Sequence, residues 1–261
     1  MKPLILISND DGYQAKGINE LVRMISDMGD IIVCAPEGAR SGKSRAFSME
    51  MLTLNHIRTE GNVDVWACSG TPVDCVKMAY HRICPRKPSL VIGGINHGDN
   101  ASTNAHYSGT VGIVNEGAMK GIPSIAFSLC DYSADADFTP MRDLVRSLVR
   151  KVLDEGMPHY VALNVNYPHV PEVKGVKVCR MAHGHWRKEV DKCEHPTRNY
   201  SYYWMTGYYQ NDEPEATDTD AWALANGYVA ITPITVELTA QDYLRIGERY
   251  VSDIKIQINN N

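Results

Sequence analysis

Residues 3–12, with the sequence PLILISNDDG, decide the fold. The apolar part of this stretch has the length of a strand, and an unbroken apolar run is typical of a parallel sheet buried on both faces. Asp10, Asp11 and Gly12 follow directly, at the strand end where such sheets bind ligands. The two carboxylates repel each other unless a cation lies between them. Two interpretations remain open, a divalent metal site with oxygen ligands and a capping turn before a helix.

The chain to about residue 170 alternates between apolar runs of strand length and amphipathic helical patterns. Further strands are expected over 31–35, 90–92, 122–128 and 161–165, and two extended stretches around a Gly61-Asn62 turn within 46–68. Helices are expected over 17–28, from Pro72 onward, from 107–112 to about 120, and over 138–155. Strand–helix–strand units with right-handed crossovers predict an α/β fold.

The alternation fades after residue 170. Residues 176–180 and 200–205 resemble the strands of a hairpin, and a run of large aromatic side chains accompanies them. This arm packs either on a partner subunit or back on its own domain. A short helix from Thr217–Asp220, a strand over 228–233 and a helix over 240–250 are expected beyond it, with a frayed tail at 259–261. We therefore expect one α/β domain over residues 1–261, with a core of about 1–170 and 213–235, a β arm of about 173–212 and a C-terminal segment of 236–261.

Composition excludes several classes of protein. Apolar residues make up 44% of the chain, and the net charge of −5 argues against binding to duplex nucleic acid. The seven cysteines are odd in number and form no C-x-x-C pair, which favours a reducing, cytoplasmic location without a zinc site. No signal peptide or run of transmembrane length is found, so no membrane association is expected. The P-loop, G-x-S-x-G, G-x-G-x-x-G and H-E-x-x-H patterns are also absent from the sequence.

Three more polar segments follow expected strands. The loop over residues 37–45 contains Ser41, whose hydroxyl can bind a metal, although an ordinary solvated loop is the simpler interpretation. The glycine-rich segment 93–100 supplies Asn side chains that can act as neutral ligands. The Ser108-Gly109-Thr110 turn opens a helix, where exposed backbone amides suit a phosphate.

The ordered set of motifs resembles the SurE family of survival-protein nucleotidases, and the likeness covers nearly the whole chain. The motifs are Ser8–Gly12, Arg40–Gly42, Ser69–Cys75, Gly94–Asn100, Ser108–Val111, Tyr203–Met205, Thr217–Asp220 and Gly227–Pro233. Two positions depart from the usual pattern, Gly93, where many members have Ser, and Lys43, where a small residue is common.

The resemblance implies a Rossmann-like, doubly wound, mostly parallel sheet with a swapped C-terminal extension, assembled as a homodimer or homotetramer. It implies a phosphomonoesterase that hydrolyses nucleoside 5′- and 3′-monophosphates and uses one divalent cation, Mg²⁺ or Mn²⁺, per subunit. The family's metal ligands correspond to Asp10, Asp11, Ser41 and Asn96. Its phosphate contacts correspond to Asn100 and to Ser108, Gly109 and Thr110.

The implied chemistry is physically coherent, since Mg²⁺ and Mn²⁺ prefer hard oxygen ligands and lower the pKa of bound water. Asp10 and Asp11 are the expected catalytic residues. We favour attack by a metal-activated water over a covalent aspartyl-phosphate at Asp10. The alternative function is a nucleotide-binding or sensor protein that uses the same loops without turnover.

Overall fold

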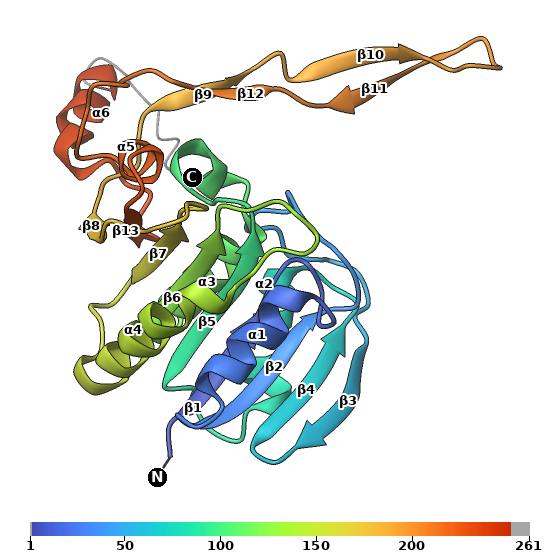
Figure 1. Cartoon of the computed structure of the whole chain (residues 1–261), viewed down its shortest axis with the longest axis vertical. Coiled ribbons are helices and arrows are strands. Elements are labelled where there is room, and N and C mark those ends of the chain that lie inside the picture. The colour runs from blue at the N-terminus through green and yellow to red at the C-terminus, as the bar shows by residue number, and fades with distance from the viewer. Residues whose placement is uncertain (1, 252–261) are drawn as a thin grey trace, which may run out of the picture.

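The computed structural model describes residues 2–251 and shows a nine-stranded sheet with helices on both faces (Figure 1). The strands lie in the order β3-β4-β2-β1-β5-β6-β7-β13-β8. Pairing is parallel from β4 to β7 across the sheet and antiparallel at β3–β4 and β13–β7. The expected doubly wound, mostly parallel α/β fold is therefore confirmed.

The first half of the chain builds the centre of this sheet. Its elements are β1 (Leu4–Ser8), α1 (Lys16–Ile25), β2 (Asp30–Pro36), β3 (Leu54–Glu60), β4 (Val63–Cys68), α2 (Pro72–Met78), η1 (Ala79–Ile83), β5 (Leu90–His97), η2 (Ser102–His106), α3 (Gly109–Met119) and β6 (Ser124–Leu129). Strand β3 begins later than expected, because residues 37–53 form an irregular loop. The Gly61-Asn62 turn lies between β3 and β4, as predicted.

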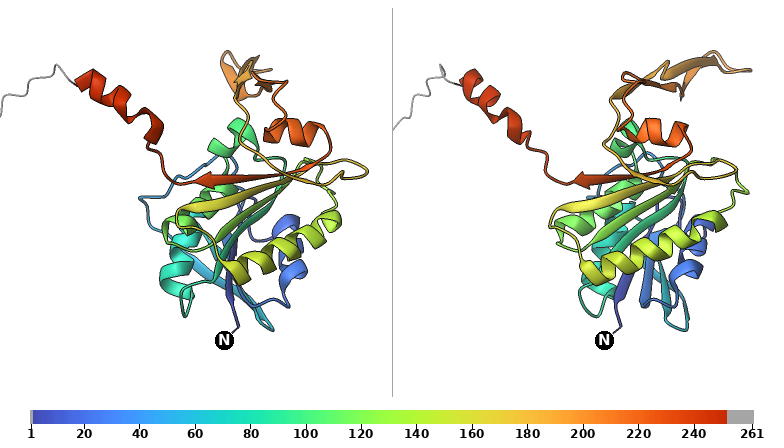
Figure 2. Two further views of the ribbon diagram at one scale, coloured as in Figure 1. Left: turned by 90° about the vertical axis from the view of Figure 1, so that its left-hand side faces the viewer. Right: turned by 60° about the vertical axis from the view of Figure 1, so that its left-hand side comes forward.

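Alternate side chains of β1 point to opposite faces of the sheet and therefore belong to two separate layers of the core. Ile5 and Ile7 pack in a cluster with α1 and with α4 (Arg142–Glu155), which follows η3 (Thr139–Met141). Leu4 and Leu6 point to the other face and pack with α2 and α3. Figure 2 shows α4 lying along one face of the sheet. Because both faces are covered, β1 is apolar from Leu4 to Ile7 and lacks the polar alternation of an exposed strand.

The position of β1 locates the edge at which a ligand can bind. Strand β1 pairs with β2 on one side and with β5 on the other, so the chain winds away from it in both directions. Loops that follow neighbouring strands diverge at such a switch point and leave a crevice at the carboxyl ends. The Asp10-Asp11 pair follows β1 directly and therefore lies at this crevice.

The second half of the chain adds the antiparallel edge and the arm. Its elements are β7 (Val161–Tyr167), β8 (Val176–Val178), β9 (Gly184–Arg187), β10 (Val190–Glu194), β11 (Ser201–Met205), β12 (Tyr208–Asn211), α5 (Asp220–Ala225), β13 (Val229–Thr235), η4 (Gln241–Tyr243) and α6 (Leu244–Val251). Figure 1 shows the β9–β12 and β10–β11 pairs as one long ribbon that crosses above the carboxyl ends of the central strands. Helix α6 stands away from the core (Figure 2).

The prediction that residues 176–180 pair with 200–205 is wrong. Strand β8 pairs with β13 in parallel and extends the central sheet, whereas β11 pairs with β10. Strands β11 and β13 both carry residues typical of strands, and the sequence does not indicate which of the two pairs with β8. The arm therefore begins after β8, closer to residue 184 than to 173.

Two further expectations concern the C-terminal tail and membrane-spanning helices. The tail at residues 259–261 lies outside the described residues. Within residues 2–251, no helix combines the length and the apolar character needed to cross a membrane.

Candidate metal and phosphate site

A hollow of about 260 Å³ lies at the carboxyl ends of the central strands. Five predicted site residues line it, and they come from the segments after β1 and β2, from β5 and the segment after it, and from the start of α3: Asp10, Ser41, Asn96, Asn100 and Ser108. Asp11 and the Gly109-Thr110 pair lie beside these residues rather than in the wall itself. The parallel sheet thus brings together side chains that are up to about a hundred residues apart in sequence.

Asp10 is almost completely buried, with 4% of its surface exposed. Its Oδ1 accepts a hydrogen bond of 2.6 Å from the hydroxyl of Thr110, and the backbone amides of Gly109 and Thr110 also favour its charged form. Burial is the larger effect, so the pKa of Asp10 is raised above its ordinary value. A carboxylate in this position gains from any cation that compensates for its lost hydration.

The carboxylate of Asp11 has fewer hydrogen-bond partners than that of Asp10. Its Oδ2 is buried and has no hydrogen-bond partner in the described structure. Burial first, and then the neighbouring Asp10 charge, raise the pKa of Asp11 to about 6, while His97 opposes this shift. A buried, unpartnered carboxylate oxygen next to a second carboxylate is the arrangement that a bound cation would satisfy.

The turn after β1 holds the two carboxylates in place. Asn9 donates its side-chain amide to the carbonyl of Gly12 at 3.0 Å and accepts the Gly12 amide at 3.1 Å. Gly12 has a φ of +103°, and a Cβ added to it would lie 3.3 Å from the α-carbon of Gly38. A side chain at this position would be strained, so the glycine is required for the sharp turn.

Asn96 and Ser41 offer neutral oxygens to the same hollow. The side-chain amide of Asn96 donates to the carbonyls of His97 and Gly98, which leaves its Oδ1 as the free group. Ser41 is exposed on the loop after β2, and the amide of neighbouring Arg40 donates to the carbonyl of Asp10 at 2.6 Å. That bond ties the loop to the end of β1.

These residues fit a hard divalent cation better than zinc. Within residues 2–251, no three His, Cys, Asp or Glu side chains are grouped so as to hold a metal. Two carboxylates completed by neutral Asn and Ser oxygens are instead the kind of donors that Mg²⁺ and Mn²⁺ accept.

The Ser108-Gly109-Thr110 turn packs directly on Asp10. Ser108 caps α3 by accepting the amide of Val111 at 3.0 Å. A Cβ added at Gly109 would lie 2.7 Å from the Cβ of Asp10. The N-terminus of α3, with its backbone amides and positive dipole end, therefore adjoins the carboxylate pair.

Asn100 is fixed by polar groups on the ends of β6 and β7. Its side-chain amide donates to Ser128 at 2.8 Å, and its backbone amide donates to Asn166 at 2.7 Å. Asn164 in turn donates to its carbonyl at 2.7 Å. Sequence reasoning found Asn100 but missed these partners, because nothing marks polar residues inside a strand as ligand supports.

Comparison with known proteins decides the family. The family described as "Survival protein SurE" matches residues 5–188. The 5′-nucleotidase SurE of Phocaeicola vulgatus is 52% identical over 240 residues, covering 92% of this chain and 93% of the relative. The 5′-nucleotidase SurE of Bacteroides fragilis is 49% identical, covering 93% and 95%. The chain belongs to the SurE family.

A solved structure supports the same conclusion for the fold of this SurE chain. The crystal structure of the SurE protein from Aquifex aeolicus superimposes with a TM-score of 0.81 at 35% identity, covering 96% of this chain and all of that one. The resemblance inferred from the motifs is therefore confirmed. The roles of individual residues remain predictions.

The hollow is also lined by residues to which the sequence analysis assigned no role in the site, among them Asp99, Asn104, Tyr132 and Trp186. Trp186 belongs to β9, so the base of the arm forms part of the wall. Asp220, which is completely buried, fastens this region by accepting from Ser102 in η2 and from the amide of Ala182. The arm base therefore contributes a side chain to the hollow.

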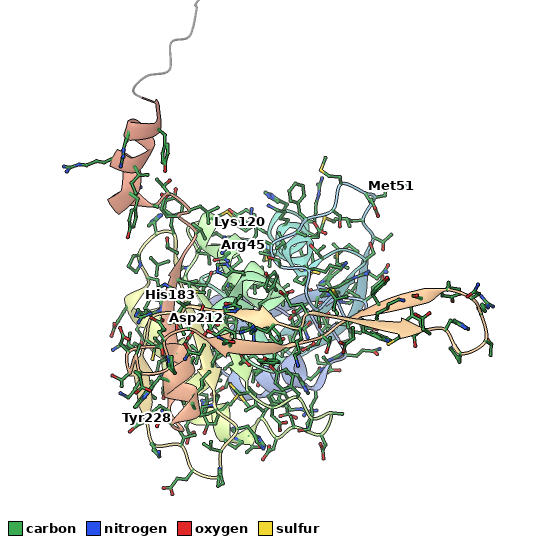
Figure 3. All side chains as sticks on the ribbon, turned by 90° about the horizontal axis from the view of Figure 1, so that it is seen from above. Arg45, Met51, Lys120, His183, Asp212 and Tyr228 are labelled. Atoms are coloured by element: carbon green, nitrogen blue, oxygen red, sulfur yellow. The ribbon has the colours of Figure 1, made fainter. Side chains whose placement is uncertain are left out.

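The arm base is also held by charged groups. Arg180 forms ion pairs with Glu213 and Asp218, and the amide of Asp212 donates to the carbonyl of His183 at 3.0 Å. Figure 3 shows His183 and Asp212 close together there, with the arm extending beyond the core.

We expect the metal-free protein to respond to pH through Asp11. Its carboxyl binds a proton below about pH 4 when unfolded but below about pH 6 when folded. The folded state therefore binds more protons between these values, and stability falls as pH rises through them. The Asp11→Asn side chain has no carboxyl proton to lose. In the presence of a chelator and above pH 7, its free energy of unfolding should therefore exceed that of the wild type by about 2 kcal/mol.

Denaturant unfolding at pH 4 and pH 7.5 measures this difference. Asp154→Asn, which changes an exposed carboxylate on α4, is the control and should follow the wild type. A stability difference between Asp11→Asn and the wild type that does not change with pH would contradict the assignment.

Proposed function

We propose that this chain hydrolyses nucleoside 5′- and 3′-monophosphates to nucleoside and phosphate. The observation that carries the proposal is the buried Asp10-Asp11 pair, with its raised pKa values and unpartnered oxygen, at the sheet edge of a chain that belongs to the SurE family. Its relatives in Phocaeicola vulgatus and Bacteroides fragilis are named 5′-nucleotidases.

One divalent cation per subunit, Mg²⁺ or Mn²⁺, is proposed at Asp10, Asp11, Ser41 and Asn96. When bound, such a cation supplies Lewis-acid stabilisation of phosphoryl charge and a water of lowered pKa. Asp10 and Asp11 are catalytic in that they hold this charge beside the reacting phosphate. The deep burial of Asp10 and its bond to Thr110 favour a holding role over nucleophilic attack by its carboxylate.

The substrate phosphate is proposed to lie against Asn100 and the Ser108-Gly109-Thr110 turn. Asn100 and Ser108 line the hollow next to Asp10, and the α3 N-terminus supplies backbone donors and a positive dipole end. Because the Thr110 hydroxyl donates to Asp10, the Thr110 side chain supports the proposed cation site next to the phosphate.

Removal of metal tests the proposed function. Phosphate release from AMP should be lost in protein treated with a chelator and return when Mn²⁺ or Mg²⁺ is added, because the carboxylate pair cannot stabilise phosphoryl charge alone. A colorimetric phosphate assay measures both states. Full activity after chelation, or tight AMP binding with no phosphate release in Mn²⁺, would contradict the proposal.

We further propose a homodimer or homotetramer in the cytoplasm. The arm exposes large side chains along β11 and β12, among them Tyr203, Trp204 and Tyr208, with 62%, 63% and 51% of their surfaces exposed. Exposed aromatic clusters of this kind are typical of interfaces. The cytoplasmic location rests on the cysteine content of the sequence.

Light scattering should give a mass of two or four subunits at micromolar concentration. Removing residues 190–205 shortens the arm but keeps Trp186, and should give smaller particles or aggregates because the exposed aromatic surface is lost. A monomeric mass for the intact chain would contradict the proposal.

A further inference from the structure

Three tyrosine and tryptophan rings line the hollow that contains Asp10, namely Tyr107, Tyr132 and Trp186, and the last two are joined by a hydrogen-bond network. Tyr132 is on the loop after β6, and Trp186 is on β9 at the base of the arm. Both line the same hollow as Asp10 and Asn96. The proposed phosphate chemistry uses neither ring, so their presence there calls for another explanation.

A single carboxylate links the two rings. Asp99 accepts a hydrogen bond of 2.9 Å from the hydroxyl of Tyr132 through Oδ2. Through Oδ1 it accepts from the side-chain amide of Asn104 at 3.0 Å and from the backbone amide of Ala101 at 3.2 Å. Asn104 in turn accepts the indole N–H of Trp186 at 3.0 Å. The chain Tyr132–Asp99–Asn104–Trp186 is continuous.

This network leaves the ring surfaces available. The one donor of the Trp186 indole is used by Asn104, so the ring offers a ligand apolar contact rather than a hydrogen bond. Strand β9 is itself anchored, because Thr103 donates to the carbonyl of Gly184 at 2.8 Å. The Tyr132 ring lies over Gly98, where any Cβ would be 2.2 Å from it. Both rings are therefore positioned before a ligand arrives.

We propose that Trp186 and Tyr132 bind the base of the nucleotide, with Asp99 and Asn104 as positioning residues; this rests on the proposed nucleotidase function. Aromatic side chains stack on any base, because every base has a π face. The rim therefore distinguishes nucleotides from sugar phosphates without selecting strongly among bases. It also makes the arm a determinant of substrate choice.

Steady-state kinetics with AMP and with ribose 5-phosphate, which lacks a base, tests this role. Trp186→Ala should raise KM for AMP about 10-fold with little change in kcat, and leave kcat/KM for ribose 5-phosphate within about twofold. Trp186→Phe keeps a ring and should stay near the wild type, and Asn104→Ala should show a smaller rise in KM for AMP alone. Trp204→Ala removes an exposed indole elsewhere on the arm and is the matched control.

An equal loss on both substrates in Trp186→Ala would overturn the proposal, since the ring would then only shape the hollow. A wild type with the same kcat/KM for AMP and ribose 5-phosphate would overturn it as well.

A binding measurement separates this proposal from the nucleotidase function. Titration with a non-hydrolysable phosphonate analogue of AMP in Mg²⁺ should quench tryptophan fluorescence in the wild type and in Trp204→Phe, but not in Trp186→Phe. Quenching that persists in Trp186→Phe would overturn the base site. If the wild type released no phosphate from either substrate, the nucleotidase function would fail, and this titration would still decide whether Trp186 contacts a base.

Discussion

Asp10→Asn should lower phosphate release from AMP by at least about a thousandfold. The side chain is 4% exposed and lies beside Asp11, so the change removes one of two charges that the proposed cation requires. Asparagine has nearly the same shape, and its Oδ1 can still accept the Thr110 hydroxyl, so the fold should survive. Phosphate release at saturating Mn²⁺ measures the effect.

Asp154→Asn is the control for this change, because Asp154 is an exposed carboxylate on α4. It lines a separate hollow at the amino ends of the strands, together with Lys2 and Arg86. Its activity should match the wild type, and a thermal melt should show both variants folded. Asp10→Asn with activity within tenfold of the wild type would remove Asp10 from the proposed catalytic centre.

Gly109→Ala should lower activity by about a hundredfold, which is the second largest effect that we expect. The added methyl group would lie 2.7 Å from the Cβ of Asp10, 3.0 Å from its Oδ2 and 3.0 Å from Pro72. Two of these contacts are with the Asp10 side chain, so relief requires Asp10 or the α3 N-terminus to shift. Either shift separates the carboxylate from the Thr110 hydroxyl and moves the proposed phosphate donors.

Gly38→Ala is the matched control, since a Cβ at Gly38 has no atom within 4 Å and the residue also lies near the turn after β1. It should retain full activity. Mn²⁺ binding, measured by calorimetry, should weaken in Gly109→Ala along with activity. A Gly109→Ala variant with wild-type turnover and wild-type Mn²⁺ affinity would show that the close packing on Asp10 has no functional role.

The carboxylate pair and its place at a sheet edge were predictable because the signal is local. Six consecutive residues indicate a buried strand, and the next four include two carboxylates and a glycine. Parallel strands end at a common edge, so Asn96 and Asn100, which belong to or follow another buried strand, were expected at the same place. The structure places Asp10, Asn96 and Asn100 around one hollow.

The hydrogen bonds between distant residues of the site could not be predicted from local sequence in this way. Thr110 and Asp10 are 100 residues apart, and the bond between them depends on how α3 packs beside β1. A threonine after a Ser-Gly pair is equally typical of a phosphate contact and of an ordinary helix start. The sequence therefore indicated a donor turn but not that the hydroxyl of Thr110 is directed at Asp10.

The arm shows most clearly which features the sequence predicts and which depend on the tertiary structure. Its aromatic content was evident from the sequence, but β8 proved to belong to the central sheet and Trp186 to the wall of the hollow. Strand pairing depends on which edge is free after the core has assembled, and that is a property of the whole sheet.

The amino-acid sequence by itself determined the buried strands and the two adjacent carboxylates at the end of the first of them, because periodicity and residue type act over a few residues. The tertiary structure decided the raised pKa values, the Thr110 bond and the rim of Tyr132 and Trp186. Burial and hydrogen bonding between distant segments exist only after the layers pack.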